Sequence, residues 1–197
     1  MEQNVSMKIN ELPSPTWNWL KVNETPIKWS NKIESCEIAA EGDVVATETE
    51  QLSDIETGAG READAIFATE NTAKYQILAD DAGQDKTVRL HISGKKDAHT
   101  AGCVEIVAKE NSTLTVVMDS RVAPDATKEE ESTAEASLAV RVRMKVERGA
   151  SVRLIQVQMP QEHETLLSDI GGNLIGEGAK VEYIELMYLN QKIKKMI

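Results

Sequence analysis

The feature of this sequence that most constrains its fold is a heptapeptide pattern that occurs four times. Each copy starts with two small or turn-forming residues, continues with a polar, an apolar and a polar residue, and ends with two apolar residues. A motif that recurs at intervals of a few tens of residues is typical of a protein that stacks one supersecondary unit. The sequence therefore predicts a repetitive architecture from residue 65 onward. The four copies cover residues 72–78, 111–117, 149–155 and 178–184.

A second apolar stretch precedes each heptapeptide, and a short polar corner separates the two. In residues 140–146, valine and methionine alternate with arginine and lysine, which predicts a strand with one buried and one solvent-exposed face. Arg141 is expected on the exposed face. The predicted unit is therefore strand, corner, strand. The preceding stretches are residues 65–68, 103–108, 140–146 and 173–175.

Such units can assemble as antiparallel hairpins in a sandwich or as successive turns of a parallel β-helix. Two-residue hairpin turns favour Asn-Gly or Asp-Gly, and the corners of this chain contain neither. One type of corner recurring at variable intervals suits a β-helix, in which equivalent corners stack and insertions form loops. Residues 119–131 are interpreted as such a loop. The predicted fold class is mainly β, with a parallel β-helix, or solenoid, over residues 65–187.

The N-terminal segment, residues 1–64, is predicted to be mostly irregular. It contains all three tryptophans, Trp17, Trp19 and Trp29, whose indole rings are expected to dock it onto the body of the domain. Residues 34–64 are acidic and rich in small side chains, which favours a loop with a short helix. Together with a divergent tail at residues 188–197, this gives three regions along the chain.

Composition excludes several classes of partner. The net charge of −11, from 33 acidic and 22 basic residues, would repel a phosphate backbone, so nucleic acid is not expected to bind. No apolar run approaches the roughly 18–20 residues that a membrane-spanning helix needs. Cys36 and Cys103 lack a paired spacing, and no stretch resembles a signal peptide. A soluble protein in the reducing cytoplasm, without a membrane partner, is expected.

Several stretches resemble the SufB/SufD family, and the resemblance spans residues 7–187. It implies a right-handed parallel β-helix and a non-catalytic scaffold role in the SUF system of iron–sulfur cluster assembly. The partners that it implies are a SufC-like ABC ATPase and a SufB or SufD sister subunit. The stretches that carry the resemblance are residues 12–13, 16–23, 108–112, 169–172 and 176–179.

After Met187 the resemblance lapses, and the chain is interpreted as a truncated member of the family. The family would continue with further strands and a C-terminal helical region that binds the ATPase. The later turns, which hold cysteine and histidine residues implicated in cluster building, are expected to be missing here. An iron–sulfur cluster is thus implied only for the full assembly, and no catalytic, cofactor-binding or metal residue is assigned. The uncovered edge near residues 181–186 is expected to pair two copies as a homo-oligomer.

Residues that could carry chemistry are few. The sequence has no phosphate-binding loop and no nucleophile elbow, so the histidines, His91, His99 and His163, are expected to be surface residues. His99 and Cys103 are four residues apart and could face one side of a strand, but two ligands make an incomplete metal site. No enzymatic activity is therefore expected.

A β-helical enzyme of the polysaccharide-lyase type is the second interpretation. The available carboxylates are Asp80, Asp81 and Asp119. A lyase on this fold needs a calcium-binding acidic cluster and a basic residue on neighbouring turns. An acidic protein would also attract polygalacturonate poorly. The scaffold interpretation is therefore preferred.

Overall fold

The computed structural model describes residues 4–9, 25–30, 32–43, 52–70, 72–123, 136–161 and 164–188. Strands dominate, which confirms the mainly β prediction, and a 3-10 helix, η2 (Arg61–Ala63), leads into the short helix α1 (Asp64–Phe67). The strands are β1 (Asn4–Ile9), β2 (Thr25–Ser30), β3 (Glu34–Ser35), β4 (Glu37–Gly42), β5 (Ala73–Ala79), β6 (Asp85–Ser93), β7 (His99–Ala108), β8 (Thr113–Arg121), β9 (Ala136–Val146), β10 (Ser151–Gln158), β11 (Glu164–Leu174) and β12 (Lys180–Met187).

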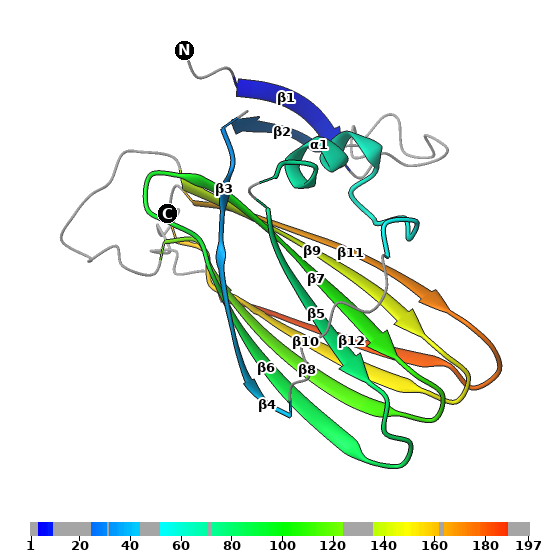
Figure 1. Cartoon of the computed structure of the whole chain (residues 1–197). Coiled ribbons are helices and arrows are strands. Elements are labelled where there is room, and N and C mark those ends of the chain that lie inside the picture. Colours follow the sequence, from blue (N-terminus) through cyan, green and yellow to red (C-terminus); the bar gives the residue numbers. More distant parts are fainter. Residues whose placement is uncertain are drawn as a thin grey trace, which may run out of the picture.

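From β5 onward the chain alternates between two sheets that lie face to face (Figure 1). The β7 sheet has the order β11-β9-β7, and β3 and β5 both pair with the remaining edge of β7. The β8 sheet has the order β12-β10-β8-β6-β4. Neighbouring strands from β5 to β12 pair in parallel, as predicted, whereas β4 joins β6 antiparallel.

The repeat alignment is confirmed for three of its four copies. Ser151 lies opposite Thr113 on one side and Lys180 on the other, so the last three heptapeptides occupy equivalent positions in β8, β10 and β12. The first copy is different, because residues 72–78 contribute to β5 in the opposite sheet. Its place in the β8 sheet is taken by β6, where Asp85 lies opposite Thr113.

The corners explain why each heptapeptide starts with small or turn-forming residues. Equivalent corner residues have positive φ angles, which glycine and asparagine adopt most readily. Asn111 stacks directly on Gly149, where a Cβ would overlap the asparagine side-chain oxygen. Backbone hydrogen bonds join successive corners, including Asn111 N to Arg148 O at 3.0 Å. The stacked positive-φ residues are Gly83, Asn111, Gly149 and Gly178.

Two hydrophobic clusters hold this arrangement. The larger fills the space between the two sheets and includes Val142 and Leu154, both 0% exposed. The second lies on the outer face of the β7 sheet, where β1, β2 and α1 cover the strands (Figure 1). Trp29 is buried in this second cluster, which confirms its docking role, whereas Trp17 and Trp19 lie outside the described residues.

Three predicted boundaries are wrong. Within its described residues, the N-terminal segment contains strands β1 to β4, which the sequence did not predict, although the expected short helix is present. Residues 65–68 were expected as a strand, but α1 covers residues 64–67. A helical turn allows the adjacent Ile66 and Phe67 to be buried together, whereas a strand would direct them to opposite sides. The loop expected from residue 119 starts later, because β8 continues to Arg121.

Candidate functional site

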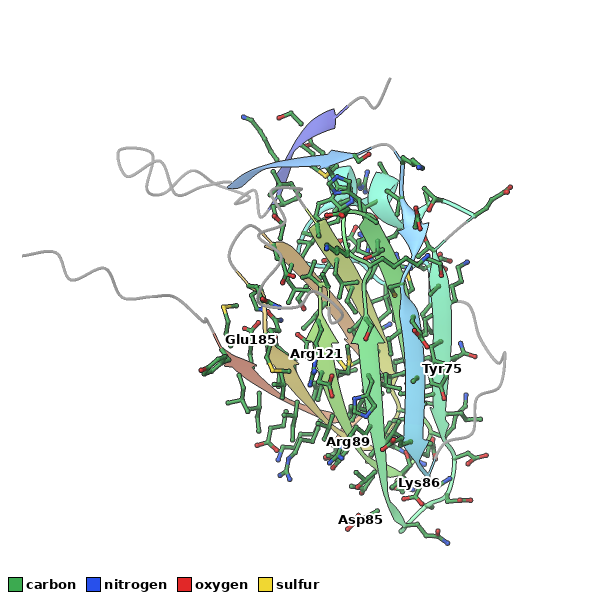
Figure 2. The ribbon with its side chains drawn as sticks, turned by 90° about the vertical axis from the view of Figure 1, so that its left-hand side faces the viewer. Tyr75, Asp85, Lys86, Arg89, Arg121 and Glu185 are labelled. Carbon is green, nitrogen blue, oxygen red and sulfur yellow. The ribbon has the colours of Figure 1, made fainter. Side chains whose placement is uncertain are left out.

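Within the described part of the chain, the exposed large hydrophobic side chains lie at the end of the stack formed by β11 and β12. In Figure 2, Glu185 on β12 and Tyr75 on β5 mark opposite ends of the stack. Isolated exposed apolar side chains are common, whereas several of them along one strand are a candidate interaction surface. Within the described ranges, the exposed large hydrophobic residues are Leu174, Ile175, Tyr183, Ile184, Leu186, Met187 and Tyr188.

Among the described strands, β12 has a neighbour on one side only, so its outer edge presents backbone groups without a strand partner. Lys180 N donates to Ala150 O and Tyr188 N donates to Gln158 O, both at 2.9 Å. The even-numbered residues of β12 therefore face β10, and residues 181, 183, 185 and 187 direct their N–H and C=O groups away from the sheet. No strand that the structure describes pairs with this edge. Such an edge is a template for another strand.

A polar group links the two sheets at the same end. The side-chain oxygen Oε1 of the buried Gln156 accepts hydrogen bonds from Ser168 Oγ at 2.8 Å, Tyr183 OH at 3.1 Å and Gln158 Nε2 at 3.1 Å. Burial and the neighbouring Glu185 carboxylate raise the pKa of Tyr183 to about 12. The phenol therefore stays protonated at neutral pH and acts as a hydrogen-bond donor.

The edge of β11, by contrast, is in contact with a distant segment of the chain. Gly58 N donates to Ile170 O at 3.1 Å. A Cβ on Gly171 would overlap the carbonyl oxygen of Glu56, so this segment passes directly against the strand. Glycine at position 171 permits this close approach.

Arg141 anchors the same segment to the outer face of the β7 sheet. Its side chain is 2% exposed. Its Nε donates to Asp169 Oδ2 at 2.6 Å and its Nη1 donates to Asp64 Oδ1 at 2.7 Å. The guanidinium carbon lies 4.2 Å from the centre of the Phe67 ring, a cation–π contact. Arg141 was expected on a solvent-exposed face, and that expectation is wrong.

Asp169 completes this buried network. Besides Arg141, its carboxylate accepts hydrogen bonds from Thr57 Oγ1 at 2.7 Å and from Ala59 N at 2.8 Å. The charge of this fully buried carboxylate is therefore balanced by the arginine and by two further donors. The sequence pattern gave no sign of this network, because alternation marks two faces of a strand but does not show which distant segment covers one of them.

The two cysteines are both free and buried. Cys36 belongs to the cluster between the sheets and Cys103 to the cluster on the outer face of the β7 sheet. Burial raises the pKa of Cys36 to about 12 and also raises the pKa of Cys103. Iron and zinc bind the thiolate form.

His99 is likewise held by other residues. The strand β7 begins at His99, so His99 and Cys103 do share one face, but Nδ1 of His99 lies 2.5 Å from Ser137 Oγ. Its ring also lies 6.0 Å from that of Trp29. No group of three or more histidine, cysteine, aspartate or glutamate side chains within the described ranges could hold a metal ion.

The other sequence candidates form separate ion pairs. Asp80 and Asp81 contact Lys86 Nζ at 3.4 and 2.7 Å, in the corner before β6. Asp119 Oδ2 instead lies 2.5 Å from Nδ1 of His91, on the outer face of the β8 sheet. The carboxylates considered for a calcium site are therefore not gathered in one place. His163 lies outside the described residues.

No protein-family model matches the chain, and no curated protein or solved structure was found to match it. In the part of the chain that the structure describes, no helix is long and apolar enough to cross a membrane.

Proposed function

We propose that this protein is a non-catalytic scaffold component of the cytoplasmic SUF system and that its two sheets belong to a right-handed parallel β-helix. The observation that carries the proposal is where the family-like residues lie. Residues 108–112 and 176–179 lie at corners of the stack, and residues 169–172 lie in β11 against the covering segment. The resemblance therefore falls on residues that determine how turns stack.

The end of the stack supports a role in protein assembly. A free strand edge beside exposed apolar side chains suits the addition of another protein surface. The charged candidate residues are engaged in separate ion pairs, which supports a structural role for them. The proposed partners are a SufC-like ATPase and a SufB or SufD sister subunit. The iron–sulfur cluster is the cargo of that assembly.

Deletion of the gene in the source organism tests this role. We expect the activity of an iron–sulfur enzyme such as aconitase to fall, while a flavin-dependent enzyme without a cluster keeps its activity. We also expect the tagged chain to co-purify with the sister subunit and the ATPase. Unchanged aconitase activity together with the absence of both partners would contradict the proposal.

The purified protein is expected to show no turnover of ATP, polysaccharide or ester substrates. His91 and Asp119 provide the sharpest control, because they form a close histidine–carboxylate pair on an open face. Polysaccharide cleavage that disappears in the Asp119→Asn variant would refute the non-catalytic role and favour the lyase interpretation.

A further inference from the structure

The strand β4 differs from the rest of the β8 sheet, because it runs antiparallel to its neighbour, β6. The other neighbouring strands of this sheet pair in parallel. β4 also forms the edge of the sheet opposite β12, so β6 is its partner in the sheet. An edge strand opens locally when one backbone ladder is broken. Side-chain contacts on the face of the sheet therefore contribute to how firmly β4 is held.

A histidine on β6 connects β4 with β8 across the outer face of this sheet. His91 lies opposite Ala39 of β4 on one side and opposite Asp119 of β8 on the other. Its Nδ1 lies 2.5 Å from Asp119 Oδ2, and its Nε2 lies 3.9 Å from Glu41 Oε2. The imidazole ring therefore lies between two carboxylates, and each carboxylate belongs to a different neighbour of β6.

The protonation state of this ring determines how many carboxylates it can bind. A neutral imidazole has one N–H donor and one acceptor nitrogen, whereas an imidazolium donates from both nitrogens. A carboxylate at each ring nitrogen is therefore complementary to the charged form, because the acceptor nitrogen of the neutral form would face one of the two carboxylates. Histidine is the side chain that ordinarily changes its charge between about pH 5 and pH 8.

The other charged groups on this face keep their charge over the same pH range. Carboxylates and arginines ordinarily titrate well outside it. On β4, Glu37 shares the outer face with Glu41, and Arg89 of β6 lies opposite Glu41. On β8, Arg121 Nε lies 3.8 Å from Asp119 Oδ1. A change in the attraction between β4 and β8 over this range is therefore expected from the histidine.

We propose that His91, Glu41 and Asp119 form a pH-sensitive clasp that holds the edge strand β4. The imidazolium attracts the carboxylates of β4 and β8 together, and the loss of its proton loosens β4. Opening of β4 exposes the backbone groups of β6, an edge that can accept another strand. The clasp therefore couples pH to access at the end of the β8 sheet opposite β12. It concerns this chain alone and is independent of the proposed partners in cluster assembly.

Hydrogen exchange of the full chain tests the clasp. The side chains of His91 and Glu41 are 38% and 67% exposed, and an exposed ion pair changes an equilibrium by up to about fivefold. The protection factors of the β4 amides that bond to β6 should therefore fall by about two- to fivefold between about pH 5.5 and about pH 8. The intrinsic pH dependence of exchange is corrected first, and the amides of β10 serve as the reference.

Two variants of β4 identify the carboxylate that takes part. Glu41→Gln should remove the pH dependence, as should His91→Gln. Glu37→Gln is the matched control and should retain it, because Glu37 is on the same face of the same strand but lies opposite Ser93. Equal protection of β4 at both pH values in the unmodified chain would overturn the proposal, and this comparison needs no variant. A pH dependence that persists in His91→Gln, or that disappears in Glu37→Gln, would overturn it too.

Discussion

Strands β11 and β12 are the last strands of their sheets, yet their surroundings differ. Segment 56–59 contacts β11 through Gly58 N, and the buried pair of Arg141 and Asp169 fixes that segment to the sheet. The corresponding edge of β12 meets no described strand, and its arginine pair, Arg153 with Glu182, is exposed to solvent. Equivalent positions in a repeat thus acquire different properties from the segments packed on them.

The repeat therefore determines which strands pair with each other, but it does not determine which strand faces are exposed to solvent. Both β9 and β10 place an arginine between apolar residues, Arg141 in β9 and Arg153 in β10. In β9 the face that carries Arg141 is covered by α1 and its preceding segment, so the Arg141 side chain is buried and binds that segment. In β10 the charged face remains open, so Arg153 makes a surface ion pair.

The largest effect is expected from Arg141→Ala. This change leaves the buried Asp169 carboxylate without its cation, and removing one partner of a buried ion pair costs about 3–5 kcal/mol. Arg153→Ala is the matched control, with an expected cost of about 0.2–1 kcal/mol, because its pair is exposed. Urea denaturation measures both free energies of unfolding. Equal losses for the two variants would contradict the contrast between covered and open faces.

Two leucines in neighbouring strands sharpen the comparison. Leu154 in β10 is 0% exposed and Leu186 in β12 is 55% exposed. Leu154→Ala should lower the free energy of unfolding by about 2–5 kcal/mol, because it leaves a cavity between the sheets. Leu186→Ala should change it by less than about 0.5 kcal/mol. A large loss for Leu186→Ala under dilute, monomeric conditions would show that the edge of β12 is buried.

The parallel pairing, the corner chemistry and the register of three repeats could be predicted from sequence, because stacked turns reuse the same corner residues. The first heptapeptide does not align with the other three in the structure, since β5 and β8 have the same alternation and only long-range pairing distinguishes them. The sequence did not indicate the network around Asp169, because Thr57, Asp64 and Arg141 come from segments that only folding brings together.

Substitution of two adjacent glycines in β11 tests how closely segment 56–59 approaches this strand. A methyl group at Gly171 would overlap the carbonyl oxygen of Glu56, whereas one at Gly172 would meet Met144 at an ordinary distance of 3.7 Å. Gly171→Ala should therefore cost about 1–3 kcal/mol through overpacking, and Gly172→Ala should cost less. Thermal unfolding compares the two. The reverse order would mean that segment 56–58 does not lie against β11.

The smallest effect on stability is expected from Tyr183→Phe, a change in the edge strand β12. Its pKa is raised from the ordinary 10.0 to about 12, so the unfolded chain loses the phenolic proton first as the pH rises. The folded state is therefore destabilised between about pH 10 and pH 12, and this loss should be reduced in Tyr183→Phe. Ultraviolet titration of tyrosinate should show that Tyr183→Phe lacks a late-titrating group. An unchanged titration curve would contradict the assigned environment.

Residue-resolved hydrogen exchange tests the central contrast most directly. At a concentration where light scattering reports a monomer, the amides of Gly58 and Ala59 should be protected by their bonds to β11. Along β12, Glu182, Ile184 and Leu186 should also be protected, whereas the amides of residues 183, 185 and 187 should exchange rapidly. Uniform protection along β12, or rapid exchange at Gly58 and Ala59, would contradict a covered β11 beside an open β12.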